Sequence, residues 1–408
     1  MGLVELDLNL TDEQKAMRDT VRKFGAEVMR PAAIALDRLA DPQDVIAKDS
    51  VLWNVFRIHR ELGLHRLGFP EPYGGLQADA LTACLVAEEM GCAAADLAIS
   101  LGVSAFPFNV AMLSPDPELQ GWVKAYMEDT KGEMIGCWAI TEPDHGSDWV
   151  HFNGPDAGNP KCAPQLRAIK KGNEYIINGQ KAAWVSNGTI ATHAALYVCL
   201  DPSQGMFGGG IAAIPLDLPG ITRGKPLNKI GQRALNQGEI YFEEVHIPEK
   251  MMVVSDPNVY KVMAEATLAA ANGGMGTTFV GLARAGFEEA LKYAQERVQG
   301  GKPIIEHQNI QLKLFEMFRS VEAARSLARR VSIYNAATMP PSAHYAIASK
   351  VTATETAFKV ASEAIQIFGG NGLSKDYHIE KIFRDAKASL IEDGENSSLS
   401  IAGARMLA

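Results

Sequence analysis

The sequence predicts an α+β protein built from three consecutive parts, because its texture changes twice along the chain. Residues 1–133 have helical periodicity, residues 134–250 contain short strand-like runs separated by Gly, Pro and Asn, and residues 251–408 return to long Ala-rich helical runs. The chain has 408 residues, more than one hydrophobic core usually supports. We therefore expect a helical domain, a β domain and a helical bundle, in that order.

The first part opens with a helix start signal. Thr11 and Gln14 have the spacing of a capping box, and apolar residues follow at helical spacing up to Val28. Pro31 is expected to end this helix. The apolar stretch 81–106 is interrupted by acidic residues, so we expect a pair of buried helices there and no membrane span.

The middle and last parts differ in the length of their elements. Strands are expected at 134–140, 166–170, 174–178, 194–200, 210–214 and 239–245. Residues 152–164 are rich in Gly and Pro and are expected to form a surface loop. Helices are expected at about 259–299, 307–336, 341–368 and after residue 396, packed as an antiparallel bundle.

Composition argues against several functional classes. The 39 basic and 48 acidic residues leave a net charge of -9, whereas a protein that binds duplex nucleic acid must neutralise phosphates. The five cysteines lack CxxC spacing, so neither a zinc site nor a disulfide framework is expected. The N-terminus carries no secretion signal pattern. We expect a soluble, cytoplasmic protein without a metal site.

The first chemically informative segment is residues 139–148, Ala-Ile-Thr-Glu-Pro-Asp-His-Gly-Ser-Asp, at the end of a predicted strand. Alone, such a loop is more often an ordinary turn. The segment resembles the signature of acyl-CoA dehydrogenases, with His145 where the family generally has a small residue. The resemblance implies that the hydroxyls of Thr141 and Ser147, together with free backbone N–H groups, contact a flavin and its phosphates, and Gly146 permits the close approach.

A second segment, residues 179–188, is similar to the family stretch that flanks the flavin ring. In that stretch Trp184 would stack on the isoalloxazine and Ser186 would hydrogen-bond near N5. One residue is inserted between Lys181 and Trp184 relative to the family. A third segment, residues 229–248, resembles the last β segment before the bundle.

A fourth segment, residues 293–308, resembles a turn that clamps FAD in the family. There Arg297 would meet the pyrophosphate of a cofactor held mostly by a neighbouring subunit, with Gln308 close by. Gly300 replaces the family's aromatic residue after this arginine.

A fifth segment contains Gln366, Gly369 and Gly370 and is similar to the family's Gln-x-x-Gly-Gly-x-Gly pattern. It is followed by the Arg-Asp-Ala motif at residues 384–386. By itself such a glycine cluster is little more than a helix C-cap. The five segments nevertheless occur in family order along residues 11–405, which makes the resemblance specific.

The resemblance implies the acyl-CoA dehydrogenase fold, with a β-barrel-like or β-sandwich middle domain and a C-terminal four-helix bundle. It implies noncovalent FAD, an acyl-CoA substrate, an electron-transfer flavoprotein as electron acceptor, and a homotetramer. The implied reaction is α,β-desaturation, in which a carboxylate removes the α-proton and flavin N5 takes the β-hydride.

The catalytic base is expected in the acidic turn 391–396. In the family the commonest base is a Glu before a Gly, and counting from the Arg-Asp-Ala motif places Asp393 there, with Glu392 as the alternative. The second family position, on the first bundle helix, aligns with Ala266, which has no ionisable group. If Glu392 and Glu395 face the same cleft, their charges should raise the pKa of Asp393, and desolvation by a bound thioester should raise it as well. Otherwise the turn is a solvated acidic loop, as most such clusters are.

Two other functions remain open at this point. An acyl-CoA oxidase, or a non-redox relative that keeps FAD, would share the same motifs, and oxygen use would identify the oxidase. A catalytically inactive helical scaffold would have lost the active-site groups, whereas Thr141, Trp184, Ser186 and Asp393 are retained. The shorter base, the segment 152–164 and Gly300 favour a cyclic or aryl-substituted acyl group.

Overall fold

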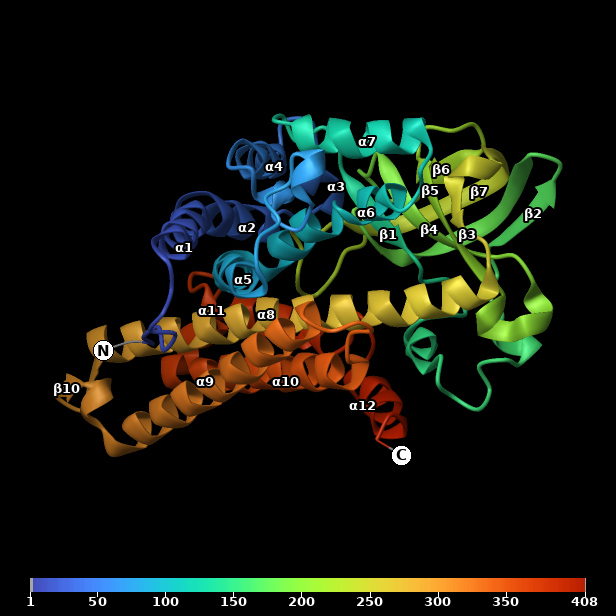
Figure 1. Cartoon of the computed structure of the whole chain (residues 1–408). Coiled ribbons are helices and arrows are strands. Elements are labelled where there is room, and N and C mark those ends of the chain that lie inside the picture. Colours follow the sequence, from blue (N-terminus) through green and yellow to red (C-terminus); the bar gives the residue numbers. More distant parts are fainter. Residues whose placement is uncertain (1–2, 408) are drawn as a thin grey trace.

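Three groups of elements follow one another along the chain in a computed structural model that describes residues 3–407. A group of helices comes first, an eight-stranded sheet follows, and a second group of helices completes the chain (Figure 1). The predicted α+β fold class is confirmed.

The N-terminal part is entirely helical. Its helices are α1 (Asp12–Phe24), α2 (Arg30–Asp37), α3 (Pro42–Val45), α4 (Val51–Glu61), α5 (Ala80–Val103), α6 (Phe106–Met112) and α7 (Pro117–Glu128). The predicted capping box is present, because Gln14 N donates to Thr11 Oγ1 at 3.2 Å and Thr11 N donates to Gln14 Oε1 at 3.0 Å.

The expectation that Pro31 ends the first helix is wrong. Residues Gly25–Met29 form a π-helical turn that connects α1 directly to α2. Pro31 then lies in the first turn of α2, where a proline is tolerated. The turn packs tightly, since a Cβ at Gly25 would lie 2.8 Å from the Cβ of Ala93 in α5.

The apolar stretch in this part forms α5 and α6. Helix α5 is interrupted at Ala94 (φ -165°, ψ 101°) and ends at Val103. By length and composition residues 80–112 could cross a membrane, but 83% of the most apolar window is buried inside the protein. The stretch therefore serves as packing surface in this fold.

The sheet contains every strand that the sequence predicts and two more. The strands are β1 (Gly136–Ala139), β2 (Arg167–Lys171), β3 (Glu174–Ser186), β4 (His193–Cys199), β5 (Gly209–Pro215), β6 (Ile221–Arg223), β7 (Gln237–Pro248) and β8 (Met252–Val254). Their order is β6-β7-β3-β2-β4-β5-β8, with β1 parallel to β4. Strands β6 and β8 escaped prediction because three residues are too few to show an alternating pattern.

The segment 152–164 is irregular and residues 155, 156 and 158–161 are exposed, as expected of a surface loop, but other residues of the segment are buried. Phe152, Ala157 and Ala163 are buried, and the first two pack in one cluster with Tyr260. The Ala157 carbonyl accepts a hydrogen bond from Met206 N at 2.7 Å. The Gly- and Pro-rich composition thus reflects close packing against the segment around residue 206.

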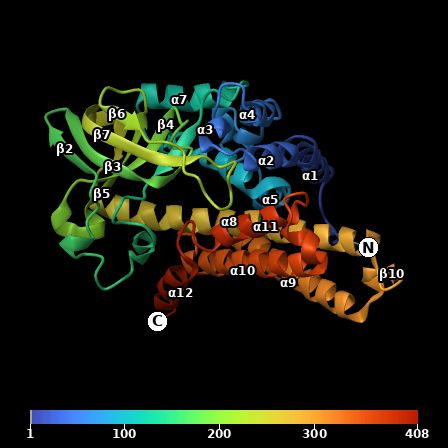
Figure 2. The same ribbon diagram turned by 180° about the vertical axis from the view of Figure 1, so that it is seen from behind.

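The C-terminal helices are α8 (Pro257–Glu296), α9 (Gln308–Ala336), α10 (Ala343–Phe368), α11 (Ile379–Ser389) and α12 (Asn396–Arg405). Helices α8 to α11 share one apolar core, to which α5 also contributes. Helix α8 has 40 residues and runs beneath both the N-terminal helices and the sheet (Figures 1 and 2). Helix α8 thus packs against the other two parts as well as against its own bundle.

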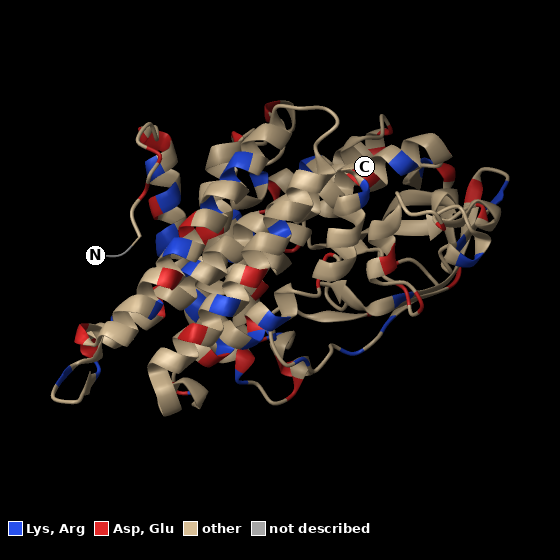
Figure 3. Ribbon diagram, turned by 90° about the horizontal axis from the view of Figure 1, so that it is seen from below, with Lys and Arg blue, Asp and Glu red and all other residues tan. Residues whose placement is uncertain are grey.

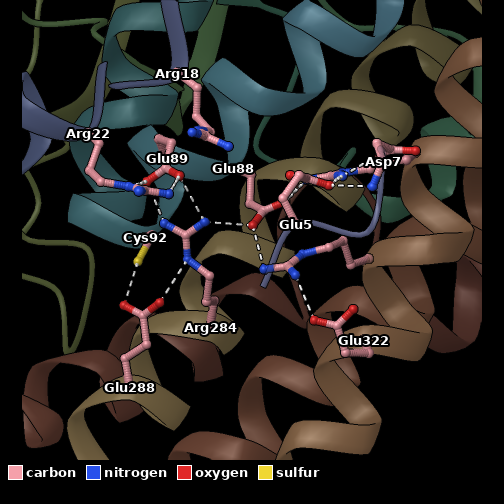
Figure 4. Close-up of polar contacts among 12 residues, drawn as sticks. Glu5, Asp7, Arg18, Arg22, Glu88, Glu89, Cys92, Arg284, Glu288 and Glu322 are labelled. Carbon is pink, nitrogen blue, oxygen red and sulfur yellow. Dashed lines mark hydrogen bonds and ion pairs between the residues drawn. The ribbon is translucent and has the colours of Figure 1, made fainter. Parts of the chain in front are cut away.

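Acidic residues within apolar α5 are neutralised by arginines of the bundle (Figure 4). Glu88 contacts Arg284 of α8 at 2.6 Å. It also contacts Arg325 and Arg329 of α9 at 2.8 and 3.1 Å. Glu89 contacts Arg284 at 2.5 Å. Since an unpaired buried charge is strongly unfavourable, these carboxylates depend on their arginines.

The segment before α1 completes this arrangement. Glu5 and Asp7 each contact Arg329 at 2.6 Å, which ties the N-terminal segment to α9. We call Glu5, Glu88, Glu89, Arg284, Arg325 and Arg329 the α5–bundle ion cluster. Elsewhere on the helices acidic and basic residues are interleaved, and Figure 3 shows both signs along the bundle.

Candidate active site

The loop that follows β1 is fixed to strand β3. The Thr141 carbonyl accepts a hydrogen bond from Ala182 N at 2.9 Å. Glu142 is buried and contacts the buried Lys181 Nζ at 2.7 Å. The loop that carries Thr141 and Ser147 is therefore held beside the strand that carries Trp184 and Ser186.

His145 stabilises the contour of this loop. Its Nδ1 lies 2.6 Å from Asp148 Oδ2, and Asp148 Oδ1 accepts the Gly146 N–H at 2.6 Å. The His145 side chain is buried, whereas a Cβ at Gly146 would meet no atom within 4 Å. His145, which is larger than the family's usual residue at this position, thus points into the protein and leaves open space beside Gly146.

Trp184 and Ser186 lie at the end of β3. The Trp184 side chain is 57% exposed, so it is not a core tryptophan. Gln237 Nε2 donates to the Trp184 carbonyl and to Ser186 Oγ, both at 3.2 Å, and Lys229 Nζ donates to Gln237 Oε1 at 2.7 Å. This network fixes the backbone while the indole face remains available to a flat ligand.

The inserted residue before Trp184 lies where the strand register breaks. Lys181 pairs with Ile240 and Val185 pairs with Gly238, so β3 advances four residues while β7 advances two. Such a bulge leaves residues unpaired and changes the direction of their side chains. Trp184 belongs to this bulge.

The acidic turn lies between α11 and α12 and contacts the loop after β1. Asp393 (φ 51°) and Gly394 (φ 100°) both have left-handed backbone. A Cβ at residue 394 would lie 2.8 Å from Val150 Cγ1, so glycine is required there on both grounds. Glu395 N donates to Ser147 Oγ at 2.9 Å. The structure therefore brings Ser147 of the β domain to the turn that carries Asp393.

The two adjacent carboxylates of this turn have different partners. Glu392 Oε1 accepts a hydrogen bond from Gln232 Nε2 at 2.5 Å, and burial together with repulsion from Asp393 raises the pKa of Glu392 to about 7. Burial raises the pKa of Asp393 to about 6, against the opposing charge of Lys350. Within residues 3–407 no donor is hydrogen-bonded to the Asp393 carboxylate. Of the two, Glu392 is thus the one held by a side-chain hydrogen bond.

Glu395 has a structural role that the sequence analysis left open. Its carboxylate accepts hydrogen bonds from Ser397 N and Ser398 N at 2.9 and 3.0 Å, and these bonds lower its pKa. It is the N-cap of α12. The pKa of Asp393 is raised, as expected, but burial is the cause and not repulsion by Glu392 and Glu395.

The Arg-Asp-Ala motif supports the turn from α11. Arg384 contacts Asp37 of α2 through two hydrogen bonds of 2.9 and 2.7 Å. Asp385 accepts the Gln232 N–H at 2.5 Å. The motif therefore joins the helical parts to the segment that holds Glu392.

Five predicted cofactor residues lie away from this site. They are all exposed and belong to the ends of α8 and α10 and the start of α9: Arg297, Gln308, Gln366, Gly369 and Gly370. A short hairpin of β9 (Val298–Gln299) and β10 (Lys302–Pro303) marks this end of α8, opposite to the sheet (Figure 1). Gly300 forms the hairpin turn with φ 63°, which explains a glycine in place of an aromatic residue.

Two polar residues of the site were missed from the sequence. Gln232 was passed over because a lone glutamine in a loop carries no signal. Lys350 did carry a sequence signal, because it lies at helical spacing from Ala346, Ala353 and Ala357, which are all buried in α10. A lysine on a buried helix face is uncommon and indicates a specific partner.

The comparisons with known proteins agree with this geometry. Family models for the N-terminal, middle and C-terminal domains of acyl-CoA dehydrogenase match residues 11–113, 137–245 and 261–407. The chain belongs to the acyl-CoA dehydrogenase family. It is accordingly an oxidoreductase that acts on CH–CH bonds, and the recognition made from the five segments is confirmed.

Three similar proteins span almost the whole acyl-CoA dehydrogenase chain. Cyclohex-1-ene-1-carbonyl-CoA dehydrogenase of Syntrophus aciditrophicus (strain SB) is 30% identical over 399 residues, covering 98% of this chain and 90% of the relative. Butyryl-CoA dehydrogenase from Megasphaera elsdenii has a TM-score of 0.85 and 27% identity, covering 99% of this chain and 100% of that one. A chain from a structure that describes the electron transferring flavoprotein of Acidaminococcus fermentans also has a TM-score of 0.85 and 27% identity. The match covers 98% of this chain and 99% of that one.

Acyl-CoA dehydrogenases depend on FAD, and the residues present fit that cofactor. An exposed indole next to the Ser186 hydroxyl suits a flavin ring, and the open space at Gly146 suits close approach to the loop that carries Thr141. Gly369 and Gly370 likewise have no atom within 4 Å of a built Cβ.

Proposed function

We propose that this acyl-CoA dehydrogenase uses Asp393 as the base that removes the α-proton of an acyl-CoA thioester. The observation that carries the proposal is the Asp393 carboxylate, which has a pKa raised to about 6 and no hydrogen-bond donor within the described residues. A base works best when its pKa lies near the working pH, because it is then ionised and still sufficiently basic.

FAD, when bound, supplies the acceptor for the β-hydrogen and its electrons. Trp184 would pack against the flavin, with the hydroxyls of Ser186, Thr141 and Ser147 near its polar edge. The hydrogen bond from Glu395 N to Ser147 Oγ holds the loop after β1 next to the turn that carries Asp393. Electrons then pass to an electron-transferring flavoprotein, a partner consistent with the similarity to a chain from such a structure.

We propose a cyclic acyl group as the preferred substrate. The short helix that begins at Ser147 contributes Trp149 to a buried cluster of neighbouring rings, with centroid separations of 6.0 to 6.3 Å, that comprises Trp149, Phe152, Tyr260, Tyr197 and Trp138. Asp393 is one methylene shorter than the family's usual base, which leaves room for a bulkier α-carbon. A relative that is named for a cyclohexene thioester agrees with this proposal.

The test is anaerobic mixing of the purified protein with a panel of thioesters. We expect a yellow protein with noncovalent FAD whose absorbance is bleached faster by cyclohex-1-ene-1-carbonyl-CoA than by butyryl-CoA. A folded protein that neither retains nor takes up FAD contradicts the function. Faster bleaching by butyryl-CoA contradicts only the cyclic substrate, and rapid reoxidation by oxygen identifies an oxidase instead.

We also propose a homotetramer in which the exposed end of α8 contacts the cofactor of a neighbouring subunit. Arg297 lies at the end of α8 that is opposite to the sheet, far from Trp184 and Ser186 of the same subunit. If substitution of Arg297 lowers the FAD content, Arg297 must therefore contact the cofactor of another subunit. We expect Arg297→Ala to lower the FAD content, whereas Lys292→Ala, an exposed residue of the same helix, leaves it unchanged. Sedimentation that finds a fully active, FAD-loaded monomer would contradict the proposal.

A further inference from the structure

Lys350 is fully buried on α10, directly beneath the acidic turn. Its Nζ donates hydrogen bonds to the Gly394 carbonyl and to Asn396 Oδ1, both at 2.8 Å. Asn396 is in turn held by Thr354, to which its Nδ2 donates at 3.0 Å. Both partners of Lys350 are uncharged, so its hydrogen bonds alone do not neutralise a buried ammonium.

We propose that Lys350 is a positioning residue for Asp393: it fixes the backbone on the C-terminal side of the base and places a buried positive charge beneath it. This inference rests on the proposed role of Asp393 and adds the residue that keeps this carboxylate in its working form.

The geometric part of the argument concerns the backbone. Asp393 and Gly394 both have φ above +50°, a conformation that is unfavourable for aspartate and must be held by its surroundings. The bond from Lys350 to the Gly394 carbonyl lies immediately after the base, and the bond from Glu395 N to Ser147 lies one residue further. The turn is thus fixed from α10 and from the β domain at once.

The electrostatic part concerns the ionised fraction of Asp393. Burial raises the pKa of Asp393, and the charge of Lys350 is the opposing influence. Burial lowers the pKa of Lys350 to about 8, while Glu392, Asp393 and Glu395 oppose that change. At neutral pH the lysine is therefore still mainly charged. Without it, the pKa of Asp393 would rise further above 6, and less of the base would be ionised.

The other charged groups near the turn have partners of their own. Lys229, from the segment before β7, acts on Glu392 through its charge, and the uncharged Gln232 of the same segment acts through a hydrogen bond. Glu395 caps α12. The short helix that begins at Ser147 also carries two titratable residues.

These two residues are Asp148, which contacts His145, and His151, which contacts Arg405. Helix α8 contributes the apolar Leu268 to the cluster of Val150 and Leu399 beneath the turn. Lys350 is therefore the cation that acts on Asp393 from below.

The test removes the charge of Lys350 and leaves a polar N–H group in its place. Lys350→Gln replaces the ammonium with an uncharged amide whose N–H lies one bond nearer the backbone. The pKa of Asp393 is read from the infrared carboxyl band that Asp393→Asn lacks, titrated on the FAD-loaded protein. We expect a value near 6 in the wild-type protein and one higher by about one unit in Lys350→Gln, the usual size of a single charge effect.

A matched control lies one turn further along α10. Thr354→Val removes a neutral partner of Asn396 and leaves Lys350 charged, so we expect the pKa of Asp393 to stay at its wild-type value. Should Lys350→Gln fail to fold, Asn396→Asp provides the second test. A carboxylate at 2.8 Å from Nζ would neutralise the lysine and shift the pKa of Asp393 upward as well.

The midpoint of flavin reduction against pH should move with the infrared value, because the base must be ionised to act. An unchanged pKa of Asp393 in Lys350→Gln, or an equal shift in Thr354→Val, would overturn the inference. A shifted infrared pKa in a protein whose flavin no thioester reduces would leave the effect of Lys350 in place and refute the proposed reaction instead.

Discussion

Asp393→Asn is expected to slow flavin reduction by acyl-CoA about 10²- to 10⁴-fold, because an amide cannot take up the α-proton. FAD content and thioester binding should be nearly unchanged, since within residues 3–407 no donor is bonded to the Asp393 carboxylate. Asparagine also tolerates the left-handed backbone at this position (φ 51°). Anaerobic stopped-flow absorbance of the flavin measures the rate, and the ratio of flavin to protein absorbance measures the cofactor.

Glu392→Gln is the matched control. The amide oxygen of glutamine can still accept the hydrogen bond from Gln232 Nε2, so the turn should keep its shape and the rate should fall far less. If Glu392→Gln abolishes reduction and Asp393→Asn does not, the base is one residue earlier than proposed. If both variants reduce the flavin at the wild-type rate, the base lies elsewhere.

The parts of the site that could be predicted from sequence are those fixed by local chemistry. Thr11 and Gln14 predict a capping box that involves only four consecutive residues, and the structure contains it. Gly394 precedes a helix cap and follows Asp393 at a turn that only a left-handed backbone permits. Motif order along the chain was sufficient for the family, because each segment keeps its own local geometry.

The parts that could not be predicted depend on contacts between distant segments. The sequence predicts that Pro31 ends a helix. In the structure a π-helical turn that packs on α5 precedes it, and Pro31 lies in the first turn of the next helix. The buried residues of segment 152–164 could not be predicted, because their packing partners lie near residues 206 and 260. The carboxylates of residues 392 and 395 look equivalent in sequence, and only their partners show that one is bonded to Gln232 and the other caps α12.

Arg284→Met is expected to lower the free energy of unfolding by about 3–5 kcal/mol, the usual effect of removing one partner from a buried ion pair. Arg284 contacts Glu88 at 2.6 Å and Glu89 at 2.5 Å, and all three side chains are buried between α5 and α8. Methionine keeps much of the volume and removes the buried partner of Glu89, which then keeps only the half-exposed Arg22, while Glu88 retains Arg325 and Arg329. The midpoint of thermal unfolding of the FAD-loaded protein measures the loss.

The control for this variant is an ion pair of the same bundle in contact with solvent. Lys313 contacts Glu363, and both side chains are more than one third exposed, so Lys313→Met should change the stability by about 1 kcal/mol at most. Adding Glu89→Gln to Arg284→Met should recover part of the lost stability, because it removes the carboxylate that has lost its buried partner. Equal losses for Arg284→Met and Lys313→Met would mean that the α5–bundle ion cluster is solvated in the folded protein and does not hold α5 to the bundle.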